Sequence, residues 1–176
     1  EEVGSDLAQQ LRDQGAKAIL AAADKENPLV FKGRNSSFHL TDPAFVELYN
    51  LVLTEARGNG INIDDGGSYD TPAHHVVLRG LTIRDVGPEG NGDGIKLSGL
   101  NNFRVEDCTI ERWGDRGSGI DMVGCHDGQV TGCTFRHRGE IAGNGVQTKG
   151  GSRGIVIQRC RFENAGGRSV NIGGST

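Results

Sequence analysis

The side chains best suited to chemistry lie at one position of a short segment that recurs along the chain. Its clearest copy is Asn-Gly-Asp-Gly-Ile-Lys-Leu-Ser-Gly at residues 91–99, with the core Gly-Ile-x-Leu-x-Gly. The first variable position of the core is polar in every copy: His39, Asn62, Lys96, Asp121, Gln147 and Asn171. Lys96 is the cation in a row otherwise made of His, Asn, Asp and Gln, which makes it the first candidate for a functional group.

Two reactions on polysaccharides fit the residues around Lys96. In β-elimination of a uronate chain, a base removes the proton α to a carboxylate and a cation stabilises the resulting dianion. Lys96 is the predicted base, and Lys149, Arg168 or a metal would bind the carboxylate. In glycoside hydrolysis, Asp93 and Asp121 would act as acid and base, since two carboxyl groups must flank the bond. Lys96, Asp93 and Asp121 are therefore the candidate catalytic residues.

The rest of the row and two further cations are candidates for binding substrate. These residues are His39, Asn62, Gln147, Lys149, Arg168 and Asn171. Asp64 and Asp65 offer the hard oxygen ligands that Ca²⁺ requires, so they form a candidate calcium site. Calcium is the one cofactor that the sequence suggests.

Each of these residues also has a purely structural interpretation. Asp before Gly is common in turns, which would account for Asp93 and for Asp65 at the start of a long turn. Lys96, flanked on neighbouring units by Asn62 and Asp121, would equally be an ion-paired surface lysine. The sequence leaves both interpretations open.

The elements that must position these residues are short strands repeated along the chain. Equivalent residues recur about every 25 to 30 positions, at Leu51, Leu81, Cys108, Cys133 and Cys160. Each unit has three short pieces in which apolar and polar residues alternate, the period of a strand with one buried face. This pattern predicts an all-β solenoid, a parallel β-helix of about five to six coils with three short strands per coil.

The turns between the strands differ in length. The corner before the Leu51 position is one residue long in every coil, which suits a tight bend in the left-handed backbone region. The loop before the Gly-Ile-x-Leu strand varies in length, and residues 66–72 form an extended flap after one such strand. We expect these loops and the flap to flank a groove that suits a linear polymer. The cysteines of the ladder are expected to be buried thiols.

The two ends of the chain carry separate predictions. Residues 1–36 are predicted to form a cap, with a short helix between Ser5 and Gly15 and strands near residues 16–22 and 28–31. Residues 37–176 are predicted to form the β-helix. Because the chain starts without Met and stops directly after a repeat strand, we expect further coils in a longer parent protein.

Composition and charge exclude several partners. The 176 residues carry a formal net charge of −4, which provides no general attraction to nucleic acid or to an anionic membrane. No apolar run approaches the roughly 18 residues of a membrane-spanning helix. We therefore expect neither a nucleic-acid nor a membrane partner, and no specific protein partner is implied.

The repeat resembles the right-handed parallel β-helix proteins of the pectate-lyase-like superfamily. The resemblance covers residues 37–176 and depends on the Gly-Ile-x-Leu strands with their one-residue corners. It implies a right-handed, single-stranded β-helix in which polysaccharide lyases place their cleft on the sheet that contains this strand. Lys96 would then sit where a lyase base could be. Residues 93–99 and 119–124 look like bacterial repeat proteins of unassigned activity, and the polygalacturonase motifs Gly-His-Gly and Arg-Ile-Lys are absent.

The leading hypothesis is an exported carbohydrate-active β-helix, a polysaccharide lyase that cleaves an acidic glycan by β-elimination. Such a protein would be secreted, periplasmic or on the cell surface. The alternative is a non-catalytic β-helix that binds glycans or builds a surface structure. A glycoside hydrolase that uses paired Asp residues is the third hypothesis.

Overall fold

The fold is an all-β solenoid in a computed structural model that describes residues 18–21, 26, 28–33, 35–68, 70–88, 91–138 and 142–174. The predicted helix between Ser5 and Gly15 lies outside these residues, so the N-terminal cap stays a prediction. The described part consists of strands and turns and contains no helix. The described residues therefore include no helix that is long and apolar enough to cross a membrane.

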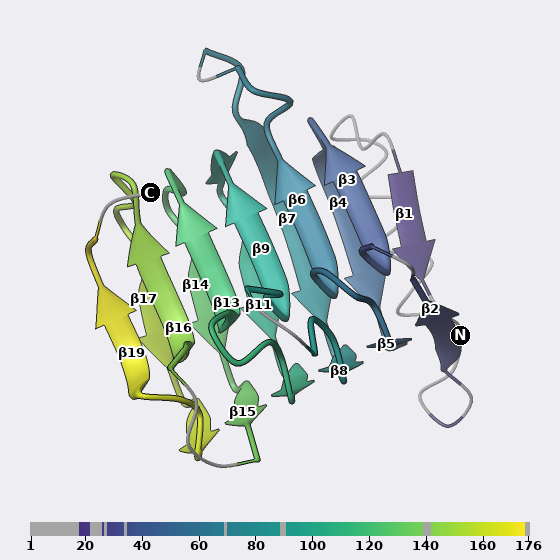
Figure 1. The fold of residues 1–176 in the computed structure, drawn as a ribbon. Coiled ribbons are helices and arrows are strands. Elements are labelled where there is room, and N and C mark those ends of the chain that lie inside the picture. Colours follow the sequence, from purple (N-terminus) through teal and green to yellow (C-terminus); the bar gives the residue numbers. More distant parts are fainter. Residues whose placement is uncertain are drawn as a thin grey trace.

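Three parallel sheets run along the molecule, and the chain visits each sheet once per coil (Figure 1). The first sheet contains β1 (Ala18–Ala21), β4 (Ala44–Tyr49), β7 (Ala73–Arg79), β10 (Leu100–Asn101), β11 (Arg104–Glu106), β14 (Gln129–Thr131) and β17 (Val156–Gln158). The second contains β2 (Leu29–Lys32), β5 (Leu51–Thr54), β8 (Thr82–Arg84), β12 (Thr109–Glu111), β15 (Thr134–Arg136) and β18 (Arg161–Glu163). The third contains β3 (Phe38–Thr41), β6 (Ile61–Asp64), β9 (Ile95–Ser98), β13 (Ser118–Val123), β16 (Asn144–Lys149) and β19 (Arg168–Ile172).

The coils stack in the register that the sequence predicts. On the third sheet the predicted polar row is a continuous ladder of paired Cα positions: His39, Asn62, Lys96, Asp121, Gln147 and Asn171. On the inner face Ile61, Ile95, Ile120 and Val146 form a parallel ladder, and each is fully buried. Burying a side chain of this size contributes about 1.5–3 kcal/mol, so the inward ladder holds the register of the outward one.

The cysteines belong to the same core. Cys108 and Cys133 occupy the position of Leu81 one and two coils on, and both are buried as free thiols. The Cys133 Sγ lies 3.5 Å from the Val105 carbonyl oxygen of the coil before it. The predicted role as small buried residues is confirmed for these two, while Cys160 is half-buried.

A column of glycines explains why the repeated motif starts with Gly. Gly60, Gly94, Gly119 and Gly145 each stand one residue before the inward Ile or Val of the third sheet and lie over one another. A Cβ on Gly94 would lie 2.6 Å from the Gly119 carbonyl oxygen and 2.5 Å from Ile110 Cγ2. Backbone atoms of the next coil leave no space for a side chain here, so glycine is required for coils to stack at the strand spacing.

The predicted left-handed corner is confirmed in every described coil. The positive φ angles are 52° at Asn50, 65° at Gly80, 51° at Asp107, 67° at Gly132 and 53° at Arg159. Asn50 lies directly under Gly80, where an added Cβ would approach the Asn50 Oδ1 to 2.6 Å. A corner residue with a side chain is therefore followed, one coil on, by a glycine. Asn50 is followed by Gly80, and Asp107 by Gly132.

Gly94→Ala tests the close approach of the coils. We expect the free energy of unfolding to fall by about 2–3 kcal/mol, because the methyl group overpacks against backbone. Gly67→Ala is the control, since its Cβ would meet nothing within 4 Å. Only its left-handed φ of 84° adds a cost of about 1 kcal/mol. Chemical denaturation compares the two variants, and equal losses would contradict the packing argument.

Candidate functional site

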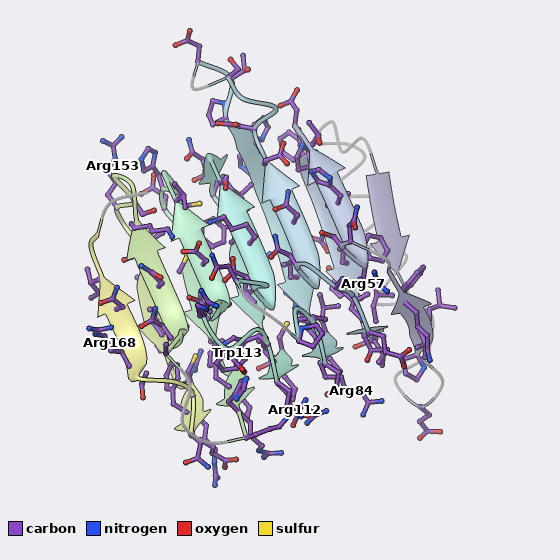
Figure 2. The ribbon with its side chains drawn as sticks, in the orientation of Figure 1. Arg57, Arg84, Arg112, Trp113, Arg153 and Arg168 are labelled. Carbon is purple, nitrogen blue, oxygen red and sulfur yellow. The ribbon has the colours of Figure 1, made fainter. Side chains whose placement is uncertain are left out.

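A polar hollow of about 400 Å³ lies on the outer face of the third sheet. It covers the start of β9 and β13 and the loops that lead into them. Its lining consists of Asn59, Asn62, Asn91, Asp93, Lys96, Arg116, Gly117, Ser118, Asp121, Gln147 and Lys149. Every second side chain of each strand points to this face. Figure 2 draws these side chains as sticks on the stacked strands.

Asp121 is the centre of the hollow, because two lysines share one of its oxygens. Asp121 Oδ2 forms ion pairs with Lys96 Nζ, on the coil before, and with Lys149 Nζ, on the coil after, the latter at 3.1 Å. The Asp121 side chain is 5% exposed, and those of Lys96 and Lys149 are 21% and 20% exposed. Asp121 Oδ1 is buried without a hydrogen-bond partner among the described residues. The two ammonium groups therefore exceed the charge of the one carboxylate that they share.

Asp93 provides a second, differently placed carboxyl group. It is buried, its Oδ1 accepts the Ser118 N–H at 2.7 Å, and its own N–H donates to Asn59 Oδ1 at 2.8 Å. Burial, and then the negative charge of Asp121, raises the pKa of Asp93 to about 7, against the opposing effects of the Ser118 N–H and the two lysines. A carboxyl group in this state can take up or release a proton near neutral pH.

The predicted catalytic residues thus line one hollow, with Lys96 joined to only one of the two carboxylates. Within the described residues Lys96 makes an ion pair with Asp121 and none within 4.0 Å with Asp93. The 66–72 flap does not close this hollow, because none of its described residues lines it. Figure 1 shows the loop between β6 and β7 projecting from the end of the molecule at which β6 finishes. The site is therefore open on that side.

The candidate binding residues divide into two groups. Asn62, Gln147 and Lys149 line the hollow, and Gln147 Oε1 accepts a hydrogen bond from Asn144 Nδ2 at 3.1 Å. Arg168 and Asn171 do not line it, and both lie on β19, the strand after β16 in the sheet. Figure 2 shows Arg168 at this end of the solenoid. His39, two coils before Lys96, also lies outside the hollow.

His39 is tied instead to the candidate calcium residues. Asp64 Oδ2 lies 2.6 Å from His39 Nε2 and accepts Asn62 Nδ2 at 2.9 Å, while Asp64 Oδ1 accepts the Gly66 N–H. Burial raises the pKa of Asp64, but the hydrogen bonds from His39 and Gly66 outweigh it and hold the pKa below its ordinary value. Asp64 is thus already satisfied by donors from its surroundings.

The predicted calcium site at Asp64 and Asp65 has little geometric support. Asp65 Oδ1 accepts the Gly67 N–H at 2.9 Å, as expected of a residue that starts a turn. In the part of the chain that the structure describes, no three His, Cys, Asp or Glu side chains gather as metal ligands would. The calcium site therefore stays a prediction, and we assign no step to Ca²⁺.

The hollow also contains residues that the sequence reasoning did not single out as site residues. Arg116 and Asn91 come from the variable loops, and Ser118 contributes its backbone N–H to Asp93. The loops have no period, so the repeat could not align Arg116 with Lys96. One signal was available: Arg116 stands four residues before Ile120, the same sequence distance that separates Asn91 from Ile95, the register partner of Ile120.

The stacked coils and the polar hollow define a right-handed parallel β-solenoid with one outward-facing polar site. The chain belongs to the family described as the right handed beta helix region, whose model matches residues 31–176. The predicted fold class and the resemblance to this group of proteins are therefore confirmed. No curated protein matches the chain at a significant level.

Two solved structures align with most of this chain. Alginate lyase from Paenibacillus sp. strain FPU-7 aligns with a TM-score of 0.68 and 20% identity, over 88% of this chain and 60% of that chain. The chain therefore spans about 60% of the length of that lyase. The A-module of the mannuronan C-5 epimerase from Azotobacter vinelandii aligns with a TM-score of 0.42 and 14% identity, over 84% of this chain and 55% of that chain. At 20% identity the similarity to the alginate lyase concerns the fold alone.

The raised pKa of Asp93 makes the stability of the protein depend on pH. The folded state retains this proton up to about pH 7, whereas an unfolded chain loses it near 3.8, so stability falls as pH rises between these values. Asp93→Asn removes this loss. We expect native protein to lose about 2 kcal/mol more than the variant between pH 5 and pH 8, measured by denaturation at each pH.

Asp115→Asn is the matched control, because Asp115 is exposed and lies outside the lining of the hollow. It should leave the pH dependence of the native protein unchanged. The same pH dependence in Asp93→Asn and the native protein would show that Asp93 titrates normally.

Proposed function

We propose that the protein is a carbohydrate-active β-helix that cleaves an acidic polysaccharide by β-elimination in the hollow. One observation carries this proposal: a buried carboxylate shared by two lysines lies beside a carboxyl group whose pKa is about 7. That arrangement supplies cations for a substrate carboxylate and a proton acceptor in the same place. The similar fold of an alginate lyase supports the class of substrate.

The charges of the hollow favour an anionic sugar. Lys96, Lys149 and Arg116 bring three cationic groups, whereas Asp121 is the partner of two of them and Asp93 holds a proton below about pH 7. A uronate carboxylate would balance the excess positive charge. The amide groups of Asn59, Asn62 and Gln147 can bind sugar hydroxyls along the same face.

In this proposal Asp93 moves the proton. Ionised Asp93 takes the proton from the carbon α to the substrate carboxylate. The electron pair of that C–H bond then forms a double bond to the β carbon. The bond between the β carbon and the glycosidic oxygen breaks, and Asp93 returns the proton to that oxygen. A pKa near the working pH suits both steps. The lysines stabilise the negative charge that develops on the carboxylate.

This assignment changes the role that the sequence predicts for Lys96. A base must have a free electron pair directed at the substrate, whereas the Lys96 Nζ is held in an ion pair with Asp121. Hydrolysis by paired Asp residues is also less favoured. Asp121 Oδ2 is already held by two ammonium groups and its Oδ1 is buried, so neither oxygen is available to a sugar or a water molecule.

Two substitutions at Lys96 separate binding from proton abstraction. Lys96→Ala should lower kcat/KM on a cleaved polyuronate by about 100-fold or more, because a cation at the developing charge is lost. Lys96→Arg keeps the positive charge, so it should remain within about 10-fold of the native enzyme. The assay follows unsaturated, ultraviolet-absorbing products from a panel of polymannuronate, polyguluronate and polygalacturonate.

Lys32→Ala is the control, since Lys32 is exposed on the second sheet and pairs with Glu55. If Lys96→Arg is as inactive as Lys96→Ala, Lys96 is the base and the role of Asp93 is refuted. Retention of a polyuronate without any product would favour the glycan-binding alternative. Saturated reducing ends would favour a hydrolase.

A further inference from the structure

One column of left-handed residues departs from the residue types that this conformation favours. After each third-sheet strand the chain turns into the first sheet, and parallel pairing aligns Ala44, His74, Asn101, His126 and Arg153. The residue that follows each of these has a positive φ: Phe45 (55°), His75 (55°), Asn102 (53°), Asp127 (54°) and Gly154 (65°). Gly tolerates this region and Asn, Asp and His are enriched in it, whereas the bulky Phe45 is an outlier there.

Phe45 and His75 lie next to each other in this column and form an aromatic cluster with His74. The Phe45 and His75 rings are stacked, with centroids 4.6 Å apart and an interplanar angle of 20°. The His74 ring stands edge-on to both, with centroid distances of 5.1 Å to Phe45 and 5.0 Å to His75. His74 Nδ1 and His75 Nδ1 are 2.9 Å apart, so one hydrogen joins the two imidazoles. The cluster is therefore fixed in position.

The cluster is accessible to a ligand. His75 is exposed, and Phe45 and His74 are half-buried. Neither Nε2 atom has a hydrogen-bond partner in the part of the chain that the structure describes. Burial, and then the charge of His74, lowers the pKa of His75, which favours a neutral ring. The cluster thus combines the exposed ring of His75 and the half-buried ring of Phe45 with two Nε2 atoms that have no partner among the described residues.

We propose that Phe45, His74 and His75 form a stacking platform for one sugar ring of a polysaccharide. The apolar C–H face of a pyranose packs on the aromatic surface, and its hydroxyls reach the two Nε2 atoms. The platform lies where the third-sheet strands end, whereas the hollow lies where β9 and β13 begin. It shares the class of ligand with the proposed function, but it requires neither turnover nor the lysines of the hollow.

The test replaces Phe45 and His75 with a residue type that favours their left-handed conformation. In Phe45→Asn/His75→Asn, both positions receive a residue that the same column already uses at Asn102. If the aromatic pair is kept for a ligand, the double variant should unfold at the same or a higher denaturant concentration than the native protein. It should also lose at least 10-fold in affinity for an oligosaccharide. A pair kept for packing would give lower stability and unchanged affinity, which would overturn the proposal.

The probe is a mannuronate hexamer, titrated into Lys96→Ala so that neither cleavage nor tight binding in the hollow interferes. We expect the Cε1–H resonances of His74 and His75 to shift and saturate in Lys96→Ala. When Phe45→Asn and His75→Asn are added, the remaining His74 resonance should stay unchanged. His137 is the internal reference: its Nε2 lies 2.7 Å from the Trp113 carbonyl oxygen, and its Nδ1 accepts the Arg138 N–H.

No shift of His74 or His75 in Lys96→Ala at any hexamer concentration would overturn the proposal, whether or not the double variant folds. A failed lyase assay combined with saturable shifts at His74 and His75 would refute only the proposed function. Product formation without these shifts would refute only the platform.

Discussion

The structure depends on one constraint: each coil must lie one strand spacing, about 4.8 Å, above the coil before it. The glycine column allows that approach, because Gly60, Gly94, Gly119 and Gly145 leave room for the backbone of the next coil. The inner ladder of Ile and Val residues then fixes the register. Side chains at equivalent outward positions are consequently held against one another whether or not their charges agree.

The polar hollow follows from this constraint. Stacking places Asp121 between Lys96 and Lys149 and presses Asp93 against the same buried patch, where two ionised carboxylates are disfavoured. The fold resolves the conflict by sharing Asp121 between the lysines and by raising the pKa of Asp93. The capacity of the site to transfer a proton and to bind an anion thus results from the same packing that stabilises the solenoid.

Those parts of the site that follow the repeat could be predicted from the sequence. Period-2 alternation and the Gly-Ile-x-Leu core were sufficient to align Asn62, Lys96, Asp121 and Gln147, and the one-residue corners predicted left-handed turns. Arg116 was not found because loop residues have no period. The flap was expected beside the hollow because a sequence does not show at which end of a strand a cleft forms. Burial, which decides the pKa of Asp93, emerges only from the assembled coils.

The most direct test of this account is the titration of the Asp93 side-chain carboxyl carbon by nuclear magnetic resonance. The central claim is that stacking forces Asp93 into a buried position beside Asp121, where it exchanges a proton near neutral pH. The account predicts a midpoint of about 7. A midpoint near the ordinary value of 3.8 would contradict it, because Asp93 would then be a solvated turn residue.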